Sequence, residues 1–311
     1  MLIPPSLRPG DTVAIVPTAR AITAEELQAG MELIESWGLR VQLGAGVGRK
    51  AFQQAGTAAE RTADLQAAIN DPGVRAIWCA RGGYGTVHLL DGLDLSPLLK
   101  DPKWIAGFSD VTVLHNALHH LGVASLHAQM PFHADRKSDG TRETLRKALF
   151  GEAYSVSKET AVSGDRPGTC EGVLVGGNLS VLYSLRGTPA DLAPTGKILF
   201  LEDLDELLYH MDRMVQNLRL GGWFSGLAGL VVGGMTDMHD KDPNDPFGRT
   251  AEAIISEAIG DVEYPVCFGF PTGHGRDNQT LVLGAKAKLS VTPEGATLSF
   301  DGPERPDASG A

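Results

Sequence analysis

The sequence has few of the features that mark disulfide-rich, secreted or membrane-spanning proteins. Only three of its 311 residues are cysteines, Cys79, Cys170 and Cys267. An odd number of widely separated cysteines favours reduced thiols over a disulfide framework. No stretch approaches the roughly 20 consecutive apolar residues that span a bilayer, and the first residues do not combine a basic segment with an apolar run. We therefore expect a cytoplasmic protein with no secretory signal and no membrane partner.

Positive charge is also in short supply. The chain carries 38 acidic residues against 27 lysines and arginines, which gives a formal net charge of -11. This balance argues against nucleic acid or an anionic membrane surface as a partner. At 311 residues and 42% hydrophobic composition, the chain is long and apolar enough to bury a large core and to form two domains.

Short apolar strands alternate with amphipathic helices in the first part of the chain. Strands are expected over residues 11–16, 39–43 and 74–80, and helices over residues 23–37 and 58–69. This alternation predicts an α/β fold with a parallel sheet covered on both faces, of the flavodoxin or Rossmann type. Ligands bind such sheets in the crevice at the carboxyl ends of the strands.

A change in composition predicts the domain organisation. Residues 151–168 are polar and rich in turn-forming residues, so we expect a linker between an N-terminal domain at 1–150 and a C-terminal domain at 169–301. The second part continues with buried strands and helices and closes with alternating segments typical of antiparallel β structure, which predicts a β-rich α/β domain. Residues 302–311 are expected to be a disordered tail.

A serine stands where an apolar strand passes directly into a helix. Residues 103–106 predict a short buried strand, residues 111–121 have helical spacing, and Ser109 lies between them after Gly107. This arrangement resembles the nucleophile elbow of serine hydrolases, although Val111 occupies the place where the familiar pattern has glycine. The alternative is a simple helix cap, with Ser109 or Asp110 accepting hydrogen bonds from free backbone N–H groups.

A glycine-rich loop at residues 81–85 follows another expected strand. Its three glycines would let backbone N–H groups approach a phosphate or an oxyanion. The loop has neither the spacing nor the lysine of nucleotide-binding loops, so a nucleotide is not expected there. A glycine turn that serves only close packing remains the alternative.

Glu202 and His274 also fall at the ends of expected strands. Glu202 ends an apolar run, and the acids that follow it, Asp203, Asp205 and Glu206, are expected in the first turn of a helix. His274 lies between two glycines after a buried segment. Ser109, Glu202 and His274 thus occur in the order nucleophile, acid and base, while a solvated strand end remains the alternative for Glu202.

Other candidate sites have simpler explanations. His115 and His119 have the spacing of a zinc pair but lack the accompanying glutamate and a third ligand, so we expect exposed or capping histidines. The acidic loop at 238–245 lacks the glycine and glutamate of a calcium loop. Cys267 lies in an apolar run, which favours a core thiol over a partner for His274. We expect no metal and no cofactor.

Five motifs together resemble the LD-carboxypeptidase family of serine peptidases. They lie at residues 77–85, 107–110, 176–179, 201–203 and 269–274. This family includes murein tetrapeptide carboxypeptidases and microcin C self-immunity peptidases, and the resemblance extends from about residue 9 to about residue 289. Residues 126–130 depart from it, because many members have His-Gly-Pro-Met there.

The resemblance implies a catalytic mechanism and a setting. It implies Ser109 as nucleophile, His274 as base and Glu202 as the acid that orients it, in an active site between the two domains. The backbone N–H groups of Gly83 and Asp110 would form the oxyanion hole. The implied protein is a cytoplasmic homodimer that removes the terminal D-alanine from tetrapeptides of recycled cell wall.

Several points stay open at this stage. The substrate carries a terminal carboxylate, and Arg81 is the candidate cation to bind it. A microcin-type peptidase acting on an aminoacyl or peptidyl nucleotide is the nearest alternative, with Trp223 as the candidate for stacking on the base. A metal-dependent hydrolase and a two-domain peptide binder without catalytic activity are the others.

Overall fold

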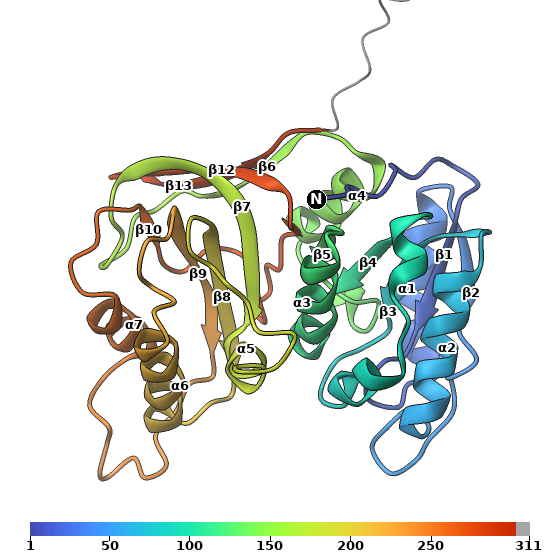
Figure 1. The fold of residues 1–311 in the computed structure, drawn as a ribbon, viewed down its shortest axis with the longest axis horizontal. Coiled ribbons are helices and arrows are strands. Elements are labelled where there is room, and N and C mark those ends of the chain that lie inside the picture. The colour runs from blue at the N-terminus through green and yellow to red at the C-terminus, as the bar shows by residue number, and fades with distance from the viewer. Residues whose placement is uncertain (303–311) are drawn as a thin grey trace, which may run out of the picture.

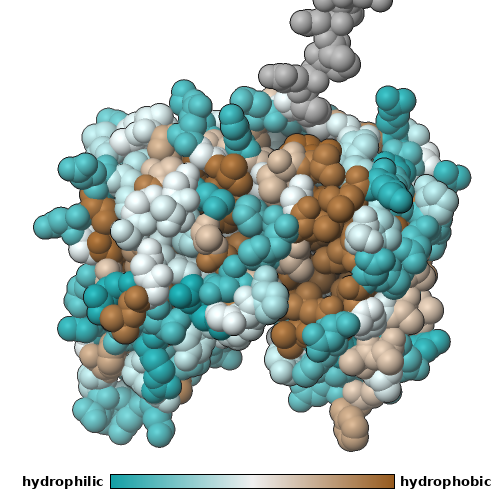
Figure 2. All heavy atoms as spheres, in the orientation of Figure 1, coloured by the Kyte–Doolittle hydropathy of each residue, from teal (hydrophilic) through white to brown (hydrophobic). Residues whose placement is uncertain are grey.

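The computed structural model describes residues 1–302 and contains two sheets, one in each half of the chain (Figure 1). Helices cover both sheets, and the space-filling view shows a notch between the two lobes (Figure 2).

The first half contains β1 (Thr12–Val16), α1 (Ala24–Ser36), β2 (Arg40–Leu43), α2 (Ala58–Asn70), β3 (Val74–Cys79), β4 (Trp104–Gly107), α3 (Thr112–Leu121), β5 (Ser125–His127) and α4 (Asp139–Phe150), with short 3₁₀ segments at Thr86–Gly92, Ser96–Leu99, Ser109–Val111 and Ala134–Arg136. The second half contains β6 (Tyr154–Lys158), β7 (Gly168–Asn178), α5 (Leu179–Ser184), β8 (Ile198–Leu204), α6 (Leu208–Leu220), β9 (Gly229–Thr236), α7 (Ala251–Ile259), β10 (Val266–Cys267), β11 (Leu281–Leu283), β12 (Lys286–Thr292) and β13 (Gly295–Phe300).

The first sheet has the strand order β11-β5-β4-β3-β1-β2. The strands from β5 to β2 run parallel, as the alternation of strands and helices predicts. The order of β1 to β5 is that of flavodoxin-like sheets, in which the chain direction across the sheet reverses between β1 and β3. The carboxyl ends of these two strands therefore flank the crevice where ligands bind.

The helices beside this sheet begin at strong sequence signals. Thr23 and Thr57 cap α1 and α2, and each forms a capping box with the glutamate three residues later, Glu26 and Glu60. In a capping box the threonine hydroxyl and the glutamate carboxylate each accept a backbone N–H that has no partner within the helix. These caps fix where the loops after the strands end.

The second sheet has the order β10-β9-β8-β7-β12-β13-β6. From β7 to β10 its strands are parallel, and from β7 to β6 they are antiparallel. It is therefore a mixed sheet, with the catalytic candidate Glu202 in its parallel part. The fold class is the mixed α/β architecture predicted from the sequence.

The structure differs from the expected segments in several places. Residues 154–158, expected as linker, form strand β6 of the second sheet, paired with β13. Strand β11 lies far along the chain but pairs antiparallel with β5, so the second half contributes a strand to the first sheet. The apolar run at 264–270 contributes only the two-residue strand β10. The tail expected at 302–311 lies, from residue 303 onward, outside the described residues.

The core consists of aliphatic and aromatic side chains of the strands and of the helix faces packed on them. One buried cluster extends over both halves, from Val13 in β1 to Phe200 in β8, and two further clusters lie within the second and the first half. Cys79 and Cys267 are fully buried there, and burial raises the pKa of each thiol to about 12. Cys267 is thus the core thiol expected from the sequence. Among residues 1–302, none of the helices is both long and apolar enough to cross a membrane.

Candidate active site

Ser109 lies on a strained turn between β4 and α3. Its φ is +63°, a left-handed conformation that is uncommon for a residue with a side chain. Gly107 permits this tight turn, because a Cβ at that position would come within 2.9 Å of a methyl group of Val111. Strained backbone of this kind concentrates at functional sites. The turn directs the partly exposed Ser109 side chain into a pocket between the two halves of the molecule.

His115 holds the same turn in place through hydrogen bonds. It is buried, its Nε2 lies 2.9 Å from the carbonyl oxygen of Gly107, and its Nδ1 lies 2.8 Å from Ser125 Oγ. Burial lowers the pKa of His115 to about 4, so this histidine is neutral and donates to the Gly107 carbonyl through Nε2. The expectation of an exposed or capping histidine is therefore wrong for His115. Its two ring nitrogens thus connect β4, which ends just before Ser109, to β5.

Glu202 and His274 form a buried pair opposite this turn. His274 Nδ1 lies 2.7 Å from Glu202 Oε2, and the Glu202 side chain is completely buried. Burial alone would lower the pKa of His274, but the charge of Glu202 and the hydrogen bond to it outweigh burial and raise that pKa. The second ring nitrogen of His274 is left to face the pocket that Ser109 also lines. Within residues 1–302, Ser109 itself makes no side-chain hydrogen bond to His274.

Two further polar side chains hold Glu202 in place. Asn178 Nδ2 donates to Asp203 Oδ1 at 2.7 Å and approaches Glu202 Oε1 at 3.3 Å. Asp203 also accepts the backbone N–H groups of Ser180 and Leu204. Burial, together with the adjacent charge of Glu202, raises the pKa of Asp203 to about 7. Asn178 thus links two neighbouring carboxyl groups that would otherwise repel each other.

Asp203 does not occupy the place expected from the sequence. It belongs to strand β8, and α6 begins only at Leu208, so the acids after Glu202 do not form the first turn of that helix. The Asp203 carboxylate instead accepts the N–H of Ser180 at the start of α5. Pairing with β9 continues to Leu204, which lies opposite Thr236, so the chain stays extended there.

The loop that carries His274 is held by residues from the first half. Lys137 Nζ donates to the carbonyl oxygen of Gly275 at 2.5 Å. The ring of Phe108, beside Ser109, lies 4.8 Å from the ring of His274. Contacts from the turn at Ser109 and from the segment before α4 therefore both fix the position of the imidazole.

The glycine-rich loop packs directly beside Ser109. A Cβ at Gly82 would lie 3.5 Å from Ser109 Oγ, so glycine leaves the space next to the hydroxyl open. The carboxylate of Asp110 accepts the backbone N–H of Thr86 at 2.8 Å. Buried Arg61 donates to the carbonyl oxygens of Gly85 and Thr18. These bonds hold the loop after β3 against both the turn at Ser109 and the loop after β1.

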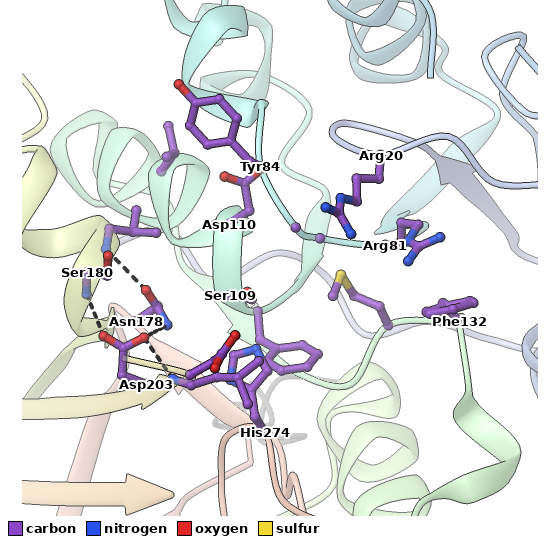
Figure 3. Close-up of a pocket in the computed structure, with 18 of the residues that line it drawn as sticks. Arg20, Arg81, Tyr84, Ser109, Asp110, Phe132, Asn178, Ser180, Asp203 and His274 are labelled. Carbon is purple, nitrogen blue, oxygen red and sulfur yellow. Dashed lines mark hydrogen bonds between the residues drawn. The ribbon is translucent and has the colours of Figure 1, made fainter. Parts of the chain in front are cut away.

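The pocket itself has a volume of about 600 Å³ and is charged differently on its two sides (Figure 3). Figure 3 shows Arg20 and Arg81 on one side of Ser109, and Asp203 with Asn178 on the other. Lys137 also lines the pocket, as do Asp205 and Glu206. The arrangement can hold an anionic group on the arginine side while an acyl group reacts at Ser109.

Other sequence candidates lie elsewhere. Trp223 is buried and packs against Arg186, whose guanidinium carbon lies 5.0 Å from the centre of its ring, and it does not line the pocket. It therefore cannot stack on a bound base there. In the part of the chain that the structure describes, no three histidine, cysteine or acidic residues are grouped as metal ligands.

Sequence reasoning missed four residues that shape the site: Arg20, Lys137, Asn178 and Asp203. The 176–179 motif contains Asn178, but nothing in the sequence indicated that its amide reaches Glu202. Arg20 could have been found, because it follows a strand of a parallel sheet just as Arg81 does. Lys137 gave no signal, since its contact with Gly275 joins residues that are 138 positions apart.

Comparisons with known proteins agree with this architecture. The family description "LD-carboxypeptidase N-terminal domain" matches residues 13–128, and "LD-carboxypeptidase C-terminal domain" matches residues 171–289. The chain is 34% identical to the probable murein peptide carboxypeptidase of Bacillus subtilis, over 95% of this chain and 93% of that protein. It is 32% identical to the murein tetrapeptide carboxypeptidase of Pseudomonas aeruginosa, over 89% and 92%.

A solved structure extends the likeness to three dimensions. The crystal structure of muramoyltetrapeptide carboxypeptidase from Oxalobacter formigenes superposes with a TM-score of 0.83 and 29% sequence identity, covering 93% of this chain and 98% of the other. Both family domains, the near-complete coverage and the shared fold lead to one assignment: the chain belongs to the LD-carboxypeptidase family.

Proposed function

We propose that this protein is a serine carboxypeptidase that cleaves the L,D-amide bond of murein tetrapeptides and releases the terminal D-alanine during peptidoglycan recycling. Its relatives in Bacillus subtilis and Pseudomonas aeruginosa are named for murein peptides, and the similar structure is named for a muramoyltetrapeptide. The chemistry of the pocket fits an acyl-transfer reaction on a small peptide.

A single observation carries the proposal. The buried carboxylate of Glu202 lies 2.7 Å from His274 Nδ1, and the imidazole faces the same pocket as Ser109, which is held at a φ of +63°. A hydroxyl on a strained turn, a histidine and a buried acid behind that histidine are the parts of a serine-hydrolase triad. The lack of a Ser109–His274 hydrogen bond among residues 1–302 does not count against the assignment, because catalytic hydrogen bonds often close only when substrate is bound.

In the acylation step, His274 accepts the Ser109 proton at Nε2 while Ser109 Oγ attacks the carbonyl carbon of the scissile amide. Glu202 keeps the other ring nitrogen protonated and stabilises the imidazolium that forms. His274 then gives the proton to the nitrogen of the leaving D-alanine, and the amide C–N bond breaks. The acyl part of the peptide remains bound to Ser109 as an ester.

Backbone N–H groups of Gly83 and Asp110 bind the oxyanion in this proposal. Gly83 belongs to the loop that packs against Ser109, and Asp110 directly follows Ser109 in the 3₁₀ segment Ser109–Val111. Removing one such donor typically costs on the order of 10² to 10³ in rate. The hydrogen bond between Asp110 and Thr86 keeps the two donors at a fixed separation.

Water completes the reaction. His274 acts again as base, water attacks the ester carbon, and Ser109 is released with its proton. These steps use only side chains and backbone groups of this chain. Arg81, at the edge of the pocket, offsets the repulsion between the substrate carboxylate and a protein of net charge -11. A cytoplasmic homodimer is part of the same proposal and is supported by the family resemblance.

The microcin-type alternative gains no support from the pocket. Trp223, the candidate for stacking on a nucleotide base, is buried outside it.

The test is turnover of defined substrates by the wild type and by Ser109→Ala. Wild-type protein should release D-alanine from a murein tetrapeptide, with no product from the all-L analogue or from an aminoacyl-sulfamoyl adenylate, as followed by mass spectrometry. Ser109→Ala should fold normally and lose turnover by orders of magnitude, whereas Ser225→Ala, an exposed serine outside the pocket, should not. Near-normal turnover by Ser109→Ala would reject the proposal, and binding without turnover by the wild type would indicate a peptide-binding protein.

A further inference from the structure

Two arginines stand at the point where the first sheet reverses its strand order. Arg20 is in the loop after β1, and Arg81 is in the loop after β3. These strands are direct neighbours and parallel, with Val16 paired to Cys79 at their carboxyl ends. In doubly wound sheets this crevice is the place where ligands bind. Both arginines line the Ser109 pocket (Figure 3).

Arg20 is positioned by contacts that leave its charge free. Its backbone forms an isolated bridge with Gln54, and its Nη2 donates to Gln53 Oε1 at 3.0 Å. Its aliphatic stem lies against Gly83, where a Cβ would come within 2.7 Å of Arg20 Cδ. Gly83 therefore has a second role besides its backbone conformation, because any larger residue would displace Arg20 from the edge of the pocket.

Arg81 is also held in place by two contacts. Its guanidinium carbon lies 4.1 Å from the centre of the Phe132 ring, and Nη1 donates to the carbonyl oxygen of Ala21 at 3.3 Å. The Ala21 carbonyl is adjacent to Arg20 in the chain, so the two loops are bonded to each other. Stacking on an aromatic face restricts the guanidinium to one plane while leaving its other donors available.

Neither arginine has a carboxylate partner. Among residues 1–302, no acidic oxygen lies within 4.0 Å of the charged nitrogens of Arg20 or Arg81, although nine other lysines and arginines make such ion pairs. The acid with the largest effect on Arg81 is Glu26, whose carboxylate already accepts the N–H of Thr23 in the α1 capping box. Burial and, after it, the charge of Arg20 lower the pKa of Arg81. Two unpaired cations side by side in an acidic protein are costly unless an anion binds between them.

The position of the pair indicates which anion it binds. Gly82 contacts Ser109 and Gly83 contacts Arg20, so two consecutive residues connect the nucleophile to the arginine side of the pocket. A carboxypeptidase cuts the last peptide bond, which leaves the terminal carboxylate only a few bonds from the scissile carbon. We infer that Arg20 and Arg81 together bind the carboxylate of the leaving residue and so select peptides with a free carboxyl terminus. This inference rests on the proposed function.

Binding measured without catalysis tests the pair. In a Ser109→Ala background, calorimetry would compare a murein tetrapeptide that ends in a free carboxylate with the same peptide ending in a carboxamide. The parent should prefer the carboxylate, and adding Arg20→Gln or Arg81→Gln should weaken carboxylate binding by about 10- to 100-fold, the usual range for a charge-assisted hydrogen bond. Carboxamide binding should change less than about twofold, since a neutral amide gains little from a guanidinium.

Arg219→Gln is the matched control. Arg219 is also exposed and also donates to a glutamine, with Nε 2.7 Å from Gln216 Oε1, but it lies on α6 outside the pocket. It should leave both affinities unchanged. Equal losses for carboxylate and carboxamide peptides in Arg20→Gln and Arg81→Gln would overturn the inference, as would unchanged carboxylate binding. Wild-type turnover of the same tetrapeptide is measured in parallel, so that failure of the proposed function is recognised separately.

Discussion

Thr112 Oγ1 accepts the backbone N–H of Asn178 at 3.0 Å, and this bond joins the two halves of the molecule at the active site. Thr112 begins α3, three residues after Ser109, and Asn178 ends β7. Gly177 permits the close approach, because a Cβ there would lie 2.6 Å from the same hydroxyl oxygen. The helix that follows Ser109, α3, is thus in direct contact with Asn178, which also binds Glu202.

Replacing Thr112 by valine should uncouple the halves while keeping the side-chain volume. The buried N–H of Asn178 would lose its acceptor, at a cost of about 1–3 kcal/mol in the free energy of unfolding. Turnover should fall as well, since Asn178 and Glu202 would no longer be fixed relative to Ser109. Denaturant unfolding and steady-state kinetics measure the two effects. Thr112→Ser keeps the hydroxyl and should retain most of the activity; a Thr112→Val enzyme with wild-type kinetics would show that the bond does not position the site.

Glu202→Gln should change the pH dependence as well as the rate. A base must be neutral to act, so kcat/KM should fall as the pH decreases through the pKa of His274, which Glu202 raises above its ordinary value. Glutamine removes that influence and leaves burial, which lowers the pKa. The acid limb should therefore move to lower pH, while the plateau drops by on the order of 10³ to 10⁴. A pH–rate profile with a reduced plateau but an unmoved acid limb would contradict the assigned pairing.

Asp203→Asn should destabilise the protein through one lost acceptor. Asp203 Oδ1 accepts from Asn178 and Leu204, and Oδ2 accepts from Ser180. An asparagine keeps the first oxygen but places an NH₂ group against the Ser180 N–H, which should cost about 1–3 kcal/mol in the free energy of unfolding.

The size of that loss should depend on pH in a definite direction. The pKa of Asp203 is raised by burial, so its protonated form favours the folded state at low pH and this contribution disappears as the pH rises through about 7. Asp203→Asn should therefore destabilise more at pH 5 than at pH 8, as measured by urea unfolding at both. Asp205→Asn is the control, because the Asp205 side chain is 75% exposed and should change stability little at either pH.

The sequence alone was sufficient to predict the structure wherever a local pattern determined it. The predicted strand, glycine bend and helix around Ser109 correspond to β4, the 3₁₀ turn and α3, because apolar spacing and the turn residues act within a dozen positions. Glu202 could be singled out for a similar reason, since an acid that ends an apolar strand is costly unless it is paired. The parallel order of the first sheet followed from its alternating elements.

Features that depend on distant parts of the chain were not predictable in this way. Strand β11 joins the first sheet, although its apolar run looked no different from those of the antiparallel strands after it. Strand β6 lies in a stretch whose alternate residues face solvent, so its composition resembled a linker. The place of Asp203 was misjudged because an acidic run looked like the first turn of a helix. In each case the deciding contacts join segments far apart in sequence.

Replacing Gly176 by alanine tests how closely β7 must pack against β8, the strand that carries Glu202. Gly176 has a φ of +130°, and a Cβ there would overlap the carbonyl oxygen of Phe200 in β8, two residues before Glu202. Gly176→Ala should therefore cost more than about 3 kcal/mol in the free energy of unfolding, or prevent folding, because backbone cannot move aside as a flexible side chain can.

Gly187→Ala separates this overlap from strain in the backbone alone. Gly187 also has a positive φ, +75°, but nothing lies within 4 Å of its Cβ position, so its alanine variant should lose only about 1–2 kcal/mol. Equal stabilities for the two variants in denaturant unfolding would show that β7 and β8 can separate at Gly176, and that the position of Glu202 does not depend on this close contact.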